Sequence, residues 1–362
     1  MEGLLATLYD IPLLGLLFQL VAYLIDVLPR ISPIILGLAA PIALGALCGV
    51  LNERSGVVNI GIEGTMLIAA FVGFLAAGIY DAAMPAERMD IFGATPALVV
   101  GVVAAVGAGL LVATLHAWLS ISIRADQIIS GTIINIAALG LTGYFNRLVI
   151  SPNPNLGAGT FRSFDPPQEL IDLPLVGWLL RMFLDQGPIA MSVIVFVVIL
   201  QVLLFRSRWG LRTRAVGEHP RAADTVGIDV IRLRYRNVIA GGAFAGLAGA
   251  YLTLEATSSF QNGMTSGRGF IALAAVIFGR WTPIGSFGAA LLFTALEALG
   301  VAFSLRPPKD DLAELGALVA NIPSEVYGSL PYLVTIILLA GVVGRSVAPA
   351  SVGRPYEKES RA

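Results

Sequence analysis

The chain has 362 residues, of which 56% are hydrophobic and only 13% charged, and its mean hydropathy is +0.82. This composition is too apolar for a water-soluble globular domain, so it indicates an integral membrane protein. The formal net charge of -1 argues against nucleic acid as a partner, because duplex binding depends on a concentrated basic face.

The N-terminal stretch MEGLLATLYD has neither the basic region nor the small-residue cleavage site of a removable signal. We therefore expect the mature protein to be the whole chain. The single cysteine, Cys48, lies in an apolar run. A lone cysteine excludes an internal disulfide framework and a Cys-based metal site, so we interpret it as a packing residue.

Apolar runs long enough to cross a bilayer contain about 20 residues. Ten segments are predicted, at 11–29, 33–51, 56–79, 96–119, 127–149, 188–205, 238–258, 269–279, 284–303 and 330–344. The eighth is too short to span alone, and whether 269–283 spans or re-enters stays open. The predicted fold class is all-α: a polytopic membrane protein with about ten transmembrane or re-entrant helices, a single transmembrane domain over 1–346 and a tail over 347–362.

Positive residues collect on the cytoplasmic side of short loops, and this bias orients the chain. With the N-terminus inside, 15 of the 23 Lys and Arg residues are cytoplasmic, whereas the outer loops collect acids such as Asp81, Asp165 and Asp310. Both termini are therefore predicted to be cytoplasmic. Two blocks of four segments, about 33–149 and 238–346, also suggest an inverted repeat, an arrangement that places a substrate pathway near the interface of the repeats.

The predicted cytoplasmic stretch 206–237 carries eight arginines. Pro220 suits the first turn of a helix and Gly227 suits the residue just past its end. A helix of about two turns, Pro220 to Val226, is therefore predicted, and so short a helix needs a partner to pack on. A solvated positive loop is the plainer alternative.

Five polar residues singled out inside predicted spans are Asn59, Glu63, Asn135, Glu255 and Glu297. A carboxylate in hydrocarbon costs several kcal/mol, so such residues face a cavity, a partner or a pathway. Hydrogen bonding between helices explains each of them about equally well. In the polar stretch 258–269, Phe260 is a candidate to stack on a flat ring and Gln261 to offer a donor and an acceptor, although a plain loop explains this stretch equally.

The chain holds two lysines, Lys309 and Lys358, and neither follows the Gly-x-x-x-x-Gly spacing of a phosphate-binding loop. Two histidines and one cysteine suggest no metal cluster and no nucleophile triad. We therefore expect a chain that is not an enzyme, has no cofactor of its own and catalyses no ATP hydrolysis.

Three stretches carry a resemblance to a known family: Asn52-Glu-Arg-Ser-Gly-Val-Val-Asn-Ile-Gly-Ile-Glu-Gly64, Arg124-Ala-Asp-Gln-Ile-Ile-Ser-Gly-Thr-Ile-Ile-Asn135, and Gly263 to Trp281. They resemble the nucleoside and simple-sugar permeases of bacterial ABC importers, which are related to the permeases for ribose and branched-chain amino acids. The resemblance covers roughly 33–358 and favours the nucleoside branch.

This resemblance implies a permease in the bacterial inner membrane, in contact with lipid, that works with a second permease subunit, a cytoplasmic ABC ATPase and an extracytoplasmic substrate-binding protein. It also implies a cytoplasmic coupling helix, since Arg221-Ala-Ala-Asp-Thr-Val-Gly227 is similar to the pattern Glu-Ala-Ala-x-x-x-Gly, with Arg221 in place of the Glu. The implied ATPase-coupling residues are Arg212, Glu218, His219, Pro220, Arg221, Ala222, Ala223, Asp224 and Gly227.

Two other functions stay open at this point. One is a sugar or amino-acid importer of the same architecture. The other, from a different class, is an ion-coupled secondary transporter in which Glu63 or Glu255 carries a proton. We expect Asn59, Glu63, Asn135 and Glu255 to line the substrate pathway, with Phe260 and Gln261 near it.

Overall fold

The computed structural model describes residues 12–86, 89, 92–173, 176–308, 312–323, 326, 327, 329, 333 and 347–357. Within these residues the regular structure is helical and no residue lies in a strand. Seven helical stretches of the described chain are long and apolar enough to cross a membrane: Gly15–Arg54, Ile62–Ala83, Pro96–Ser122, Gln127–Ile150, Pro188–Arg206, Val230–Thr257 and Pro283–Phe303. The prediction of an all-α, multi-pass membrane fold is confirmed.

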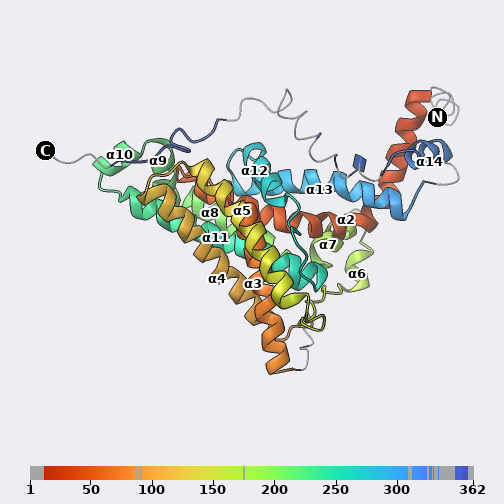
Figure 1. The fold of residues 1–362 in the computed structure, drawn as a ribbon. Coiled ribbons are helices and arrows are strands. Elements are labelled where there is room, and N and C mark those ends of the chain that lie inside the picture. The colour runs from red at the N-terminus through yellow and green to blue at the C-terminus, as the bar shows by residue number, and fades with distance from the viewer. Residues whose placement is uncertain are drawn as a thin grey trace. The chain divides into compact units, whose positions relative to one another are not determined.

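The elements follow one another along the chain as labelled in Figure 1. Short π-helical turns, η1 to η3, extend three of the long helices. In chain order, the helical elements are α2 (Pro12–Arg54), α3 (Ile62–Ala83), α4 (Pro96–Ala117), η1 (Trp118–Ser122), α5 (Gln127–Phe145), η2 (Asn146–Ile150), α6 (Gln168–Ile171), α7 (Gly177–Leu184), α8 (Pro188–Arg206), α9 (Arg208–Glu218), α10 (Pro220–Thr225), α11 (Val230–Tyr251), η3 (Leu252–Thr257), α12 (Arg268–Phe278), α13 (Pro283–Leu305) and α14 (Ala313–Ala320).

The N-terminal segments differ from the prediction. Residues 11–29 and 33–51 were expected to be two helices, but from Pro12 onward they belong to the single helix α2. Pro33 has no N–H to donate to the carbonyl of Pro29, which ordinarily breaks a helix. Here the helix nevertheless continues through Pro33, and the Ser32 hydroxyl lies 3.1 Å from the carbonyl oxygen of Pro29 and 3.1 Å from that of Trp178. The predicted tenth segment, 330–344, lies outside the described residues except for Leu333.

The short eighth segment is an isolated helix. Helix α12 has 11 residues and therefore a length of about 16 Å, roughly half of the hydrocarbon core. It does not continue through either end, because Gly267 before it has a φ of 81° and Arg280 and Trp281 after it have φ values of 52° and 53°. A continuous span over 269–283 is therefore excluded, and re-entry into the membrane stays a prediction.

The chain divides into two compact units. The smaller comprises Met1–Leu38, Asp165–Gln186 and Leu291–Val342. In its described part, Tyr23 stacks on Phe303 with ring centroids 5.0 Å apart, and its hydroxyl donates to the carbonyl of Arg306 at 2.9 Å. These contacts join the first part of α2 to the end of α13.

The larger unit comprises Ala39–Phe164, Gly187–Ala290 and Val343–Ala362. Helices α3, α4 and α11 pack together at its centre and α5 lies against α3 (Figure 1). Glycines allow the backbones of these helices to come close together. A Cβ built on Gly109 of α4 would lie 2.3 Å from the carbonyl oxygen of Gly242 on α11, and one on Gly249 would lie 2.4 Å from that of Met66 on α3. The helices therefore meet backbone to backbone, as small residues permit in membrane bundles.

The predicted loop 206–237 is more ordered than expected. The short helix between Pro220 and Gly227 is present as α10, and its predicted bounds are correct within one residue. The arginines before it lie on α8 and α9, and Arg232, Arg234 and Arg236 lie on the first turns of α11. The stretch is therefore a succession of helices and not a solvated loop, because Ser207 and Asp229 each accept a backbone N–H at the start of the next helix.

Glycines on the same helix provide a test of the α4–α11 contact. We expect Gly109→Ala to lower the thermal midpoint of the detergent-solubilised protein, since overpacking costs about 1–3 kcal/mol. Gly107→Ala is the matched control, because no heavy atom lies within 4 Å of its added Cβ. Thermal unfolding followed by size-exclusion chromatography measures both, and equal midpoints for the two variants would contradict the packing.

Candidate functional site

The connection between α2 and α3, residues 55–61, is a non-helical stretch lying inside the larger unit. Five of its seven residues are buried. Backbone N–H and C=O groups in such a place need partners from the protein, since an unpaired buried group costs about 1–3 kcal/mol. Turn bonds pair the first of them: Ser55 and Val57 donate to the carbonyl of Asn52 at 3.1 and 3.0 Å.

Side chains from α4 and α5 pair the next groups. The N–H of Val58 donates to Oε1 of Gln127 at 2.7 Å, and Nε2 of His116 lies 2.9 Å from the carbonyl oxygen of Val58. A carbonyl only accepts, so Nε2 carries the proton. In the neutral ring Nδ1 then accepts from the Ser130 hydroxyl at 3.1 Å. One residue of the connection is thus held on both sides by two helices.

Asn135 on α5 holds the end of the connection. Its Oδ1 accepts from the N–H of Gly64 at 2.8 Å, and its Nδ2 donates to the carbonyl of Ile60 at 3.0 Å. The backbones are in close contact here, because a Cβ on Gly131 would lie 2.7 Å from the nitrogen of Gly61. The structure therefore brings the predicted residue Asn135 to the segment that contains Asn59 and Glu63.

Glu63, in the first turn of α3, caps the half-helix α12. Its Oε1 accepts from the N–H of Gly267 at 2.8 Å and its Oε2 from that of Gly269 at 2.6 Å. These amides belong to the N-terminal end of α12, which has no intrahelical partners for them and carries a partial positive charge. A carboxylate is well suited to that position, so Glu63 fixes where α12 begins.

Glu255, in η3, makes the same kind of contact with another helix. Its two carboxylate oxygens accept from the N–H groups of Ile189 at 2.7 Å and Ala190 at 3.0 Å, in the first turn of α8. Gly187 is required beside it, since a Cβ there would lie 2.3 Å from Cδ of Glu255. Glu255 therefore serves a helix start distinct from the one that Glu63 serves.

The remaining predicted pathway residues lie in different environments. Asn59 is 2% exposed and its Oδ1 has no hydrogen-bond partner among the described residues. Phe260 is buried at 6% and packs T-shaped on Phe71, with centroids 5.2 Å apart, within the apolar cluster of α3. Gln261 is exposed, and its neighbour Asn262 accepts a hydrogen bond from Asn146 at the end of α5. The Phe260 side chain is therefore buried in packing contacts, whereas the Gln261 side chain is exposed.

The α9–α10 corner gathers the predicted coupling residues. Pro220 starts α10, and Gly227 follows it with a φ of 83° and donates to the carbonyl of Asp224 at 2.9 Å. Ala223 is buried in a cluster with Val216 of α9 and Val230 and Leu233 of α11. The other coupling residues are half-buried, namely Pro220 and Asp224, or exposed, namely Arg212, Glu218, His219, Arg221, Ala222 and Gly227.

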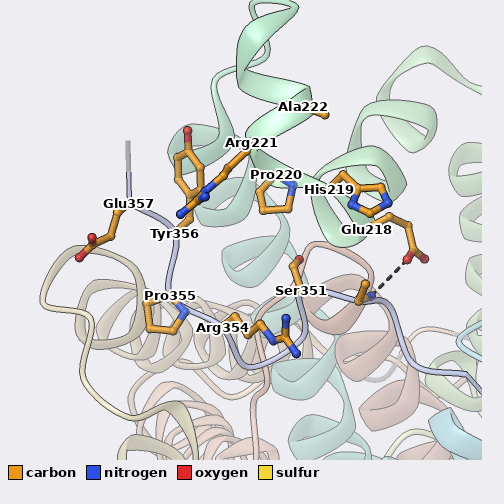
Figure 2. A pocket seen from close by; sticks show the side chains of 11 residues that line it. Glu218, His219, Pro220, Arg221, Ala222, Ser351, Arg354, Pro355, Tyr356 and Glu357 are labelled. Carbon is orange, nitrogen blue, oxygen red and sulfur yellow. Dashed lines mark hydrogen bonds between the residues drawn. The ribbon is translucent and has the colours of Figure 1, made fainter. Parts of the chain in front are cut away.

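A hollow of about 680 Å³ opens beside this corner (Figure 2). One wall comes from the end of α9 and the start of α10, residues 218–222. The other comes from the C-terminal segment, at Ala350, Ser351 and residues 354–357. The lining mixes both signs of charge, since it includes Glu218, Arg221, Arg354 and Glu357. Such a surface suits a protein partner that also carries both signs of charge.

Comparison with known proteins identifies the family of this chain. Residues 33–339 match the family described as "Branched-chain amino acid transport system / permease component". The chain belongs to this permease family. No solved structure matches it.

Among the curated relatives of this permease is the guanosine ABC transporter permease protein NupQ of Bacillus subtilis (strain 168), 39% identical over 93% of the chain and 99% of the relative. The nucleoside ABC transporter permease protein NupC of Lactococcus lactis subsp. cremoris (strain MG1363) is 34% identical over 88% and 94%. The putative glucose ABC transporter permease protein TsgC13 of Haloferax volcanii is 32% identical over 89% and 95%.

Several residues of the permease that organise these contacts were not singled out from the sequence. Gln127 follows the helix-capping Asp126, and no spacing signals that its side chain reaches Val58. Arg234 lies among exposed arginines of the same run, yet it is 1% exposed. The polar residues Asn59 and Glu63, inside a predicted span, were the sequence feature that could have indicated the buried connection.

Asn135 of the permease offers a direct test of the paired connection. Asn135→Ala leaves the N–H of Gly64 and the carbonyl of Ile60 without partners, so we expect a loss of about 1–3 kcal/mol of stability. Thr132→Ala, an exposed position one turn earlier on α5, is the control. Thermal midpoints of both purified variants check this, and an unchanged midpoint for Asn135→Ala would contradict the pairing.

Proposed function

We propose that this chain is a permease subunit of an ATP-driven importer that carries nucleosides into the cell. The observation that carries the proposal is the similarity to a guanosine permease and to a nucleoside permease, at 39% and 34% identity over nearly the whole of each chain. The aligned region takes in the membrane core as well as its loops, because it covers nearly the full length of each chain.

The assembly we propose contains a second, different permease subunit, a cytoplasmic ABC ATPase and an external substrate-binding protein. In Bacillus subtilis a second guanosine permease protein, NupP, also resembles this chain, at 27% identity over 89% of it. Two permease proteins of one organism with related names support a pair of unlike subunits. ATP is used by the ATPase partner, and this chain provides a path without covalent chemistry or a cofactor of its own.

The orientation we propose places both termini and the α9–α10 corner in the cytoplasm. The arginines between Arg206 and Arg236 support it, because positive residues accumulate on that side. Helix α10 then serves as the coupling helix that contacts the ATPase. Its exposed side chains Arg221 and Ala222, beside a hollow of mixed charge, support this assignment.

The substrate pathway we propose runs beside Asn59, Glu63, Asn135 and Glu255. Glu63, Asn135 and Glu255 hold broken or newly started helices through backbone amides, so their role is to shape the path. The buried Oδ1 of Asn59 has no hydrogen-bond partner among the described residues, and Gln261 is exposed, so we assign to both a hydrogen bond with cargo when the path opens. Because both carboxylates already accept two N–H groups each, this arrangement favours a structural role for them over proton coupling.

A sugar importer is the second candidate, since a putative glucose permease is 32% identical over 89% of the chain. Uptake of radiolabelled guanosine in cells that lack this chain, with and without its restoration, tests the proposal. We expect restored uptake that unlabelled nucleosides suppress and that glucose and leucine leave unchanged. Vanadate should abolish it, whereas an uncoupler should leave it when ATP is maintained.

Two results would contradict the nucleoside proposal or the ATP-driven mechanism. Restored cells that assemble the complex but take up no nucleoside, while taking up sugar, would move the cargo to the second candidate. Uptake that an uncoupler abolishes at constant ATP would indicate an ion-coupled transporter.

A further inference from the structure

The C-terminal strap, residues 347–357, is bound to the end of α9 by its backbone and by one side chain. Ser351 donates its N–H to the carbonyl of Gly217 at 2.9 Å, and its hydroxyl lies 2.6 Å from the same oxygen. The N–H of Ala350 donates to Glu218 at 3.1 Å (Figure 2). Further along the strap, Tyr356 is buried in the cluster that contains Ala223 of α10. The strap thus contacts both helices of the corner.

A buried arginine ties the strap to the α2–α3 connection. Arg234 of α11 is 1% exposed, and its guanidinium donates from Nε to the carbonyl of Ser55 at 3.1 Å and from Nη1 to that of Arg354 at 3.0 Å. Its Nη2 lies 3.3 Å from the hydroxyl of Ser351. Three oxygens from two distant segments therefore solvate one buried cation. Burying a cation is unfavourable unless such partners are in place, so the segments are held together.

The fit around this arginine leaves no spare room. Gly56 has a φ of 89°, and a Cβ built on it would lie 2.5 Å from Oγ of Ser351 and 2.6 Å from Nη2 of Arg234. A planar guanidinium reaches its acceptors at fixed angles, which an ammonium group does not reproduce. The identity of the residue at 234, and not only its charge, therefore sets the position of the strap.

We propose that the strap and Arg234 are positioning elements that fix the α9–α10 corner to the buried α2–α3 connection. This inference rests on the proposed contact between α10 and the ATPase. When the ATPase displaces α10, the strap moves with it through Gly217, Glu218 and Tyr356. Arg234 carries that displacement to Ser55, one end of the segment that His116, Gln127 and Asn135 hold. The strap thereby links ATP hydrolysis to the gated path.

The test uses the assembled transporter reconstituted in sealed proteoliposomes, with guanosine as the probe and its delivering protein present. The variants are Arg234→Lys, Ser351→Ala and the double variant, with Arg232→Lys as the matched control on the same helix, where the side chain is 80% exposed. For each variant the quantities measured are the amount of co-purified ATPase, the stimulation of ATP hydrolysis by probe, and uptake per ATP hydrolysed.

We expect Arg234→Lys to retain the ATPase and to lower uptake per ATP by roughly tenfold, because it removes hydrogen bonds to a charged group. Ser351→Ala should give a smaller loss, on the order of threefold, since one hydroxyl is removed. The double variant should be no worse than Arg234→Lys, because residues that act through one contact are not additive. A merely structural role would lower the amount of complex and leave uptake per ATP unchanged.

The inference is overturned if the two single variants match Arg232→Lys in uptake per ATP, or if their effects multiply in the double variant. If Arg234→Lys does not accumulate, Ser351→Ala decides alone, with normal coupling counting against the proposal. Ala222→Arg on α10 separates the underlying proposal, since it should reduce co-purified ATPase, whereas Ala82→Arg at the far end of α3 should not. Normal retention of ATPase by the Ala222→Arg variant would refute the docking of α10 on the ATPase. The uptake per ATP of the Arg234 and Ser351 variants would still show whether the strap affects coupling.

Discussion

The need to pair the backbone of one buried, non-helical segment governs this permease. Between α2 and α3 the chain leaves the helical path for seven residues, and backbone turn bonds pair only the N–H groups at its start. Side chains from α4 and α5, namely His116, Gln127 and Asn135, pair later backbone groups. Each of these side chains belongs to a helix, so its hydrogen bonds to the segment also fix the positions of α4 and α5.

The same physical solution recurs where helices start inside the protein. Glu63 and Glu255 each present a carboxylate to the N-terminal amides of another helix, one at α12 and one at α8. Each contact fixes the residue at which a helix starts. A transporter must change the relative position of such elements, and a helix held by two hydrogen bonds at one end can pivot about that end. The carboxylates are therefore suited to holding the starts of helices whose far ends can move.

Local chemistry explains what the sequence predicts well. Pro220 and Gly227 mark the two ends of α10, and the shortness of the apolar run at 269–279 anticipates the isolated helix α12. The break expected between 29 and 33 is absent, although Pro33 has no N–H to donate to the carbonyl of Pro29. Arg234 and Gln127 were missed because their partners lie 179 and 69 residues away in the chain, beyond the reach of any local pattern.

The α2–α3 connection is a hydrogen-bonded part of the protein interior. Hydrogen exchange of the intact permease in nanodiscs, read by mass spectrometry over residues 55–64, tests it most directly. We expect exchange as slow as in the adjoining turns of α3, because the N–H groups of Val58 and Gly64 are bonded to side chains. Exchange as fast as in the exposed turn at 151–155 would contradict it.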